Sequence, residues 1–197
     1  QLMPTGAVDE QNPRIFLLTG KPGSGKTTLA EHVYRQLKER GFKIGGILTR
    51  EVRLNGQRIG FKIENLQTGD TGWLAKAQEG SGPVYGRYCV NVEDLDRVGV
   101  KALEGALHDE AIDLVIVDEV GPMEMSSQRF AKTIEKLLGA ISKPVLVTFK
   151  EGTSYRALEK TVKSPYSVKF ELTSMNRYDL LARIVQMIEN QLRLQGS

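Results

Sequence analysis

Eight consecutive residues near the start of the chain follow the glycine-rich pattern G-x-x-x-x-G-K-[ST]. Residues 20–27 read Gly-Lys-Pro-Gly-Ser-Gly-Lys-Thr. The run before them, residues 14–19, is mainly apolar and β-prone, and residues 28–38 carry apolar side chains at helical spacing. A strand, a glycine-rich loop and a helix in this order form the context in which this pattern becomes a binding site.

Each residue type in this loop suits the binding of a polyphosphate. The glycines let successive backbone N–H groups turn inward around an oxyanion, and the N-terminus of the following helix adds about half a positive charge. We expect Lys26 to contact the β- and γ-phosphates and Thr27 to offer its hydroxyl to Mg²⁺. The pattern therefore predicts a nucleoside triphosphate or diphosphate with Mg²⁺ as the ligand, and we call residues 20–27 the phosphate loop. The predicted nucleotide-binding residues at this loop are Gly20, Lys21, Pro22, Gly23, Ser24, Gly25, Lys26, Thr27 and Thr28.

Signals for strands and helices alternate along the rest of the chain, which is typical of βαβ units around a largely parallel sheet. Asn-Gly at residues 55–56 stands between two β-prone runs and predicts an antiparallel β-hairpin inserted in that sheet. The sequence thus predicts an α/β fold with a mostly parallel sheet and one inserted hairpin. Strands are expected at residues 14–19, 43–52, 57–65, 114–117, 144–149 and 168–172, and helices at residues 28–38, 93–107, 127–138 and 176–194.

Composition sets the remaining bounds on the chain. Its 197 residues fit one domain, which we place at residues 14–194, and residues 1–13 are predicted to be a disordered tail. The single cysteine, Cys89, favours a cytoplasmic protein, and no apolar run approaches the ~20 residues of a membrane span. The net charge of +3 suits an anionic ligand, but no basic and aromatic stripe supports nucleic-acid binding. We expect a monomer.

A second candidate site element follows the buried strand at residues 114–117. A carboxylate at the carboxyl end of a parallel strand lies where such sheets bind their ligands, so Asp118 is expected to hold Mg²⁺ together with Thr27. Glu119 is expected to orient or deprotonate the attacking water. Val120 and Gly121 complete the predicted nucleotide-binding residues. Glu124 has two interpretations, a second carboxylate that organises water or metal and a solvated loop acid.

Hydrolysis of a triphosphate also needs positive charge on the developing transition state. The candidates are Arg50, Arg87, Arg129 and Arg177, among which the residues themselves do not choose. Phe149, Tyr155 and Tyr178 are aromatic residues that would stack on a base or pack in the core.

Three segments beyond the phosphate loop resemble one known family. They are residues 45–61 with their Asn-Gly turn, residues 86–92 (Gly-Arg-Tyr-Cys-Val-Asn-Val) and residues 118–124 (Asp-Glu-Val-Gly-Pro-Met-Glu). Across residues 14–192 the chain resembles the small nucleoside-triphosphatases of thermophilic microbes and animals, whose animal members are called cancer-related nucleoside-triphosphatases. It departs from the family pattern at Met125-Ser126, at Phe149-Lys150 and at Tyr178.

The resemblance implies a three-layer P-loop NTPase fold. It also implies slow, Mg²⁺-dependent hydrolysis of ATP, GTP, CTP and UTP to nucleoside diphosphate and phosphate. By matched position it assigns Lys26 and Thr27 to phosphate and Mg²⁺, Asp118 to Mg²⁺ and Glu119 to water activation. It adds weight to Glu124 as a catalytic residue and makes Arg87 the preferred additional cation.

Two other functions stay open at this point. A nucleotide or small-molecule kinase would use the same loop but needs a pocket for the phosphoryl acceptor. An RNA-linked NTPase, activated by a partner, would use hydrolysis to time a release. Acceptor-dependent ADP release separates the first alternative from hydrolysis, and stimulation by RNA separates the second.

Overall fold

The computed structural model describes residues 12–140 and 142–196, so the predicted disordered tail at residues 1–13 lies outside the described residues except for its last two positions. Within the described residues, nine strands form one sheet in the order β5-β6-β4-β3-β2-β7-β8-β1-β9. The strands are β1 (Ile15–Gly20), β2 (Ile44–Leu54), β3 (Gln57–Asn65), β4 (Thr71–Ala77), β5 (Val84–Tyr85), β6 (Tyr88–Val90), β7 (Leu114–Val117), β8 (Val145–Lys150) and β9 (Ser167–Leu172).

Five of these strands form the parallel part of the sheet. β2 pairs with β7, β7 with β8, β8 with β1, and β1 with β9, all in parallel. Every residue of β1 and β7 is buried, as expected for strands that are covered on both faces. Because parallel strands end at the same edge, the segments that follow β1, β7 and β8 meet there.

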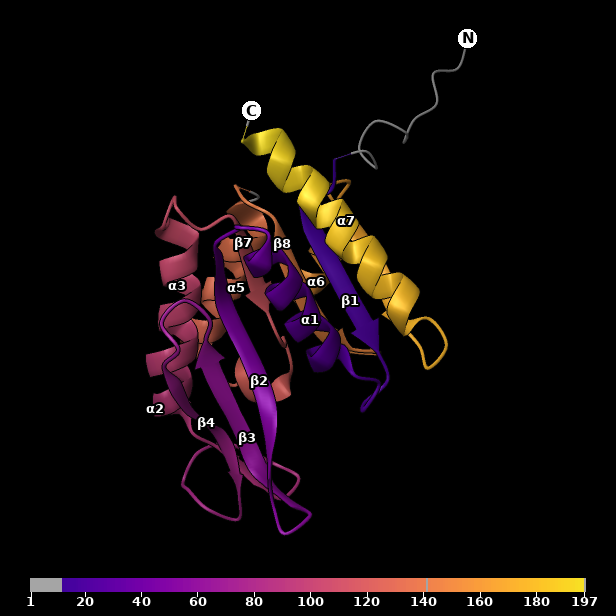
Figure 1. Ribbon diagram of the computed structural model, residues 1–197. Helices are drawn as coiled ribbons and strands as arrows, with labels where there is room; N and C mark the ends of the chain where they lie inside the picture. The colour runs from indigo at the N-terminus through magenta and orange to yellow at the C-terminus, as the bar shows by residue number, and fades with distance from the viewer. Residues whose placement is uncertain (1–11, 141, 197) are drawn as a thin grey trace.

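The other four strands make an antiparallel part that is larger than the predicted hairpin. β2 turns into β3 through Asn55 and Gly56, which have left-handed φ angles of 52° and 78°. β4, β6 and β5 then continue the antiparallel pairing. The pairing of β2 with β7 stops at Ile47, so residues 48–54 of β2 run on past the parallel edge. Figure 1 shows the β2–β3 hairpin reaching beyond the level at which β1 ends.

Helices cover both faces of the sheet and complete the predicted three layers. α1 and α7 pack on one face with residues such as Leu29 and Ile184, and α3, α5 and α6 pack on the other with residues such as Leu103, Ile134 and Leu158 (Figure 1). The helices are α1 (Lys26–Glu39), α2 (Val92–Asp94), α3 (Lys101–His108), α4 (Pro122–Met125), α5 (Gln128–Ala140), α6 (Arg156–Val162) and α7 (Arg177–Gln195), with a π-helical segment, η1 (Leu95–Val100), between α2 and α3. Among the described residues, no helix is both long and apolar enough to cross a bilayer.

The helix expected at residues 93–107 is present at that position, but it is not one continuous α-helix. Asn91 caps its start, because its side-chain Oδ1 accepts a hydrogen bond of 2.9 Å from the backbone N–H of Asp94. The π-helical segment η1 then interrupts it. Apolar spacing alone does not separate a π-helical segment from the α-helix around it.

Candidate nucleotide-binding site

The phosphate loop has the backbone shape that its glycines predict. Gly23 and Gly25 adopt left-handed φ angles of 76° and 95°, which favour glycine. Gly25 is the N-cap of α1, whose first turn contains no acidic residue. The positive end of α1 therefore points at the loop with no neighbouring carboxylate in that turn to offset it.

Lys26 is held inside the loop. Its Nζ donates to the backbone oxygen of Gly20 at 3.1 Å and to that of Lys21 at 3.2 Å. Only 7% of the residue is exposed. Burial lowers the pKa of Lys26, whereas the nearby carboxylates of Glu119 and Asp118 raise it. The ammonium is thus placed at the loop before any phosphate arrives.

Asp118 faces the phosphate loop from the end of β7. Its Oδ1 accepts hydrogen bonds from Thr148 Oγ1 at 2.6 Å and from Thr27 Oγ1 at 3.2 Å, and its Oδ2 accepts one from the Thr49 N–H at 3.3 Å. Burial raises the pKa of Asp118, and these hydrogen bonds lower it in part. The predicted pair of Thr27 and Asp118 is therefore brought together. Thr49 and Thr148 were not predicted, since a single threonine in a β-prone run gives no functional signal.

Glu119 and Glu124 place two further carboxyl groups near Asp118. A Cβ placed on Gly121 would lie 2.9 Å from Glu124 Oε2 and 3.5 Å from Glu119 Cδ, so the two side chains flank this glycine. Burial raises the pKa of Glu119, and the negative charge of Asp118 raises it further. Burial, followed by the charge of Glu119, holds the pKa of Glu124 well above its usual range. Glu124 is buried, so the interpretation as a solvated loop acid does not describe its environment.

The Oε2 atom of Glu119 is buried and has no hydrogen-bond partner among the described residues. A buried carboxylate oxygen without a donor is unfavourable unless a ligand supplies one. The following residue, Val120, packs in the core, and its backbone N–H donates to the Thr148 oxygen at 3.0 Å. This bond fixes the backbone next to Glu119 to β8. Glu119 Oε2 can then accept a hydrogen bond from a ligand.

Of the four candidate arginines, Arg177 lies against the phosphate loop. A Cβ on Gly25 would come within 2.3 Å of Arg177 Nη2, so this guanidinium occupies the space beside the glycine. Arg177 begins α7 and is part-buried. Arg50 instead forms ion pairs with Glu64 at 3.0 Å and Glu31 at 3.4 Å, and Arg129 is exposed on α5.

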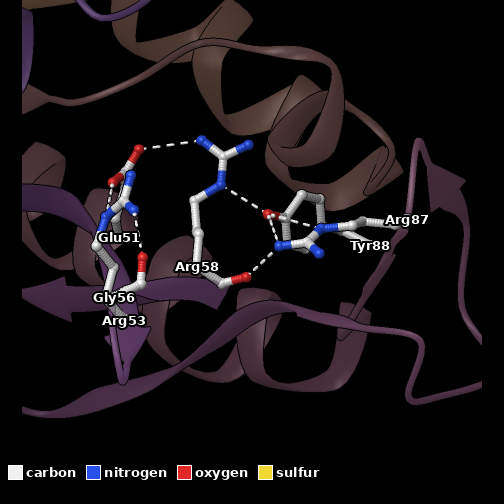
Figure 2. Close-up of polar contacts among 6 residues, drawn as sticks. All are labelled: Glu51, Arg53, Gly56, Arg58, Arg87 and Tyr88. Atoms are coloured by element: carbon white, nitrogen blue, oxygen red, sulfur yellow. Dashed lines mark hydrogen bonds and ion pairs between the residues drawn. The ribbon is translucent and has the colours of Figure 1, made fainter.

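Arg87, which the resemblance favoured, lies in the antiparallel part of the sheet. Figure 2 shows its guanidinium beside Tyr88 and Arg58. Arg87 Nε donates to Tyr88 Oη at 3.3 Å, and its Nη2 donates to the backbone oxygen of Arg58. Arg58 in turn donates to Tyr88 Oη at 2.6 Å and pairs with Glu51 at 3.0 Å. These contacts tie the hairpin to β6, and the structure does not bring Arg87 together with Lys26 and Asp118.

The family model described as NTPase matches residues 15–185. The chain belongs to this NTPase family. It is 42% identical over 166 residues to the nucleoside-triphosphatase THEP1 of Thermofilum pendens, which covers 84% of this chain and 90% of the relative. It is 46% identical over 139 residues to the protein of the same name from Methanosarcina acetivorans, covering 70% and 77%.

Two solved structures have the same fold as this chain. The crystal structure of THEP1 from Aquifex aeolicus superposes with a TM-score of 0.76 at 28% identity, covering 89% of this chain and 99% of that one. The solution structure of a human cancer-related nucleoside triphosphatase gives 0.74 at 29% identity, covering 90% and 98%. The family resemblance and the P-loop NTPase fold expected from the sequence are both confirmed.

At Phe149-Lys150, one of the positions where this NTPase departs from the family pattern, the structure places a cation, Lys150, in register with Gly20 of the phosphate loop. Burial lowers the pKa of Lys26, and the positive charge of Lys150 lowers it further. Burial and the charge of Asp118 raise the pKa of Glu119, and the charge of Lys150 offsets this rise in part. Lys150 ends β8, so the strand order brings it to the phosphate loop. Its place at the site could not be predicted, because it is a single basic residue outside any motif. Of the three aromatic candidates, Phe149 is buried, Tyr155 packs against the core and Tyr178 is exposed beside Arg177.

Proposed function

We propose that this protein hydrolyses nucleoside 5′-triphosphates to nucleoside diphosphate and phosphate, with Mg²⁺, at the phosphate loop. One observation carries the proposal: Lys26 and Thr27 on the loop face Asp118 and Glu119 at the end of β7. The names of the relatives, nucleoside-triphosphatase and nucleoside triphosphatase, support the reaction.

The residues at the loop fit a magnesium ion. Mg²⁺ is commonly bound through one or two protein oxygens together with substrate phosphates and water, and Thr27 Oγ1 and Asp118 Oδ1 lie 3.2 Å apart. Burial raises the pKa of Asp118, and a divalent cation beside it would favour the ionised form. When bound, Mg²⁺ supplies positive charge to the phosphate oxygens during transfer.

The chain's own residues account for the other needs of hydrolysis. The loop N–H groups and the N-terminus of α1 hold the β-phosphate, and Lys26 exchanges the Gly20 and Lys21 oxygens for phosphate oxygens. Glu119 orients the attacking water and accepts its proton at the oxygen that has no other donor. The raised pKa of Glu124 favours its neutral form, which would not add a third negative charge to those of Asp118 and Glu119 beside the triphosphate.

Base specificity is expected to be broad. The residues that carry the proposal act on phosphate, so ATP, GTP, CTP and UTP should all be substrates, with slow turnover. Cytoplasmic location and a monomeric state stay predictions from the sequence.

Glu119→Gln tests the assignment of the water-activating group. The variant should bind ATP as the wild type does, because the amide has the same shape, while hydrolysis falls by a factor on the order of 10²–10⁴. Glu135→Gln is the matched control, since Glu135 is exposed on α5 away from the loop. Near-normal phosphate release by Glu119→Gln would remove Glu119 from this role.

A further inference from the structure

A cavity lies between α6 and the strands β1, β8 and β9, on the face of the sheet opposite α1 and α7. Its volume is about 570 Å³, within the range of about 300–1,000 Å³ that is typical of small-molecule sites. Its floor consists of Thr19, Phe149 and Leu158, which are at most 5% exposed. Figure 1 shows α6 behind the sheet, whereas α1 and α7 lie in front of it.

The floor of this cavity contains an unsatisfied hydroxyl group. Thr19 is 3% exposed, and its Oγ1 has no hydrogen-bond partner among the described residues. Thr19 precedes the phosphate loop, but its side chain lines the α6 cavity. Buried hydroxyls are normally hydrogen-bonded, so we expect a polar atom of a ligand to form a hydrogen bond with Thr19 Oγ1.

Acidic and basic side chains lie at opposite ends of the cavity. Glu171 pairs in register with Thr19, at the end of the cavity next to the phosphate loop. Lys169 pairs with Leu17, two residues farther from that loop. Glu159 on α6 and Lys163, the C-cap of α6, are one helical turn apart in the same order, because α6 begins at the phosphate-loop end of the cavity. The carboxylates thus gather at the phosphate-loop end and the ammonium groups at the other.

These opposite charges do not neutralise one another. In the part of the chain that the structure describes, neither lysine forms an ion pair, nor do Glu159 and Glu171, although Glu159 Oε1 accepts a hydrogen bond from the Ser154 hydroxyl. Two residues along a strand place the Cα atoms of Lys169 and Glu171 about 7 Å apart. An α-amino acid carries its ammonium and carboxylate on one carbon and cannot reach both ends. A ligand with donors at one end and an anionic group at the other, across a flat apolar body, can.

We propose that the α6 cavity binds a nucleoside monophosphate whose base carries an exocyclic amino group. Lys163 and Lys169 would receive the phosphate, and the amino group would donate to the carboxylates at the opposite end. The base would lie over Phe149 and Leu158, within reach of the Thr19 hydroxyl. The phosphate then points away from the phosphate loop, so the bound monophosphate is not an acceptor of the γ-phosphate. The site is independent of the function proposed above.

Equilibrium dialysis of radiolabelled AMP against the full chain, saturated with ADP and Mg²⁺, tests this site. One AMP should be retained per chain, and ADP should stay bound. CMP should compete with AMP, whereas adenosine, UMP and inorganic phosphate should each compete at least about tenfold more weakly. Adenosine lacks the phosphate, UMP lacks the exocyclic amino group, and inorganic phosphate lacks the base.

The variants Lys163→Ala/Lys169→Ala and Thr19→Val should weaken AMP binding by about tenfold or more, with ADP affinity unchanged. Lys160→Ala, on the same helix but outside the cavity, is the matched control and should bind AMP normally. Circular dichroism checks that each variant is folded. No retention of AMP at millimolar concentration, displacement of ADP by AMP, or normal AMP binding by both folded cavity variants would each overturn the proposal.

Discussion

Asp118, Glu119 and Glu124 are three carboxyl groups whose pKa values all lie above the ordinary range because they are buried. Such a group binds its proton more tightly in the folded chain than in the unfolded one. Between the ordinary carboxyl pKa of about 4.3 and the raised value, the folded state therefore holds more protons. The stability from this source is fully present at the acidic end of that window and is lost as the pH rises through it.

Glu124→Gln should remove the largest part of this effect, because the pKa of Glu124 is raised well above its usual value. Without nucleotide and with EDTA, the variant should have a higher free energy of unfolding at pH 7 than the wild type. Its free energy of unfolding should also change less between pH 5 and pH 7. Urea denaturation at several pH values measures both. A variant less stable at pH 7 would contradict the account.

Arg177→Ala should weaken the binding of ATP and ADP by about tenfold, the loss expected for one charge-assisted hydrogen bond to phosphate. The reason is the position of Arg177 Nη2 against Gly25 of the phosphate loop. Arg129→Ala is the control, since that side chain is exposed on α5. Titration of each variant with ATP and ADP measures the dissociation constants. Equal affinity in the two variants would exclude Arg177 from the site.

At the scale of the elements, the contact between β2 and β7 depends on one glycine. Gly46 has a φ of 109°, and a Cβ there would lie 1.9 Å from the Ile116 oxygen. Gly46→Ala should therefore cost more than about 2 kcal/mol of stability, because the strands must separate at the edge that carries Asp118. Gly105→Ala in α3, where a Cβ meets nothing within 4 Å, should instead stabilise by up to about 1 kcal/mol. Thermal denaturation compares them, and a neutral Gly46→Ala would refute the close contact.

The elements that could be predicted are those with long or continuous apolar patterns. β7 was read from four consecutive apolar residues, and α1 and α7 from regular helical spacing. α6 was not predicted, because its seven residues bury two side chains and give little periodicity. β5 and β6, with two and three residues, are defined by their pairing with each other and with β4, which no local pattern reports.

At the scale of the whole molecule, the candidate site is assembled from four distant segments. The phosphate loop and residues 118–124 could be predicted because their side chains form recognisable motifs. Lys150 and Arg177 could not be chosen, since each is a single cation whose role depends on strand order. Only the fold brings the end of β8 and the start of α7 to the loop.

The same assembly predicts that nucleotide stabilises the folded chain. ADP with Mg²⁺ at 100 times its dissociation constant should add about 2.7 kcal/mol to the free energy of unfolding. Lys26→Ala should abolish this gain, because the ammonium at the centre of the loop is lost. Thermal shift with and without ADP measures it, and an unchanged shift in the variant would argue against binding at this loop.

Phosphate release from ATP, GTP, CTP and UTP, with Mg²⁺ and without any acceptor, tests the central claim most directly. The account predicts slow release from all four nucleotides, lost on chelation of Mg²⁺ and in Glu119→Gln. No release from any of them, with tight nucleotide binding retained, would contradict it and would indicate a kinase or a partner-activated protein.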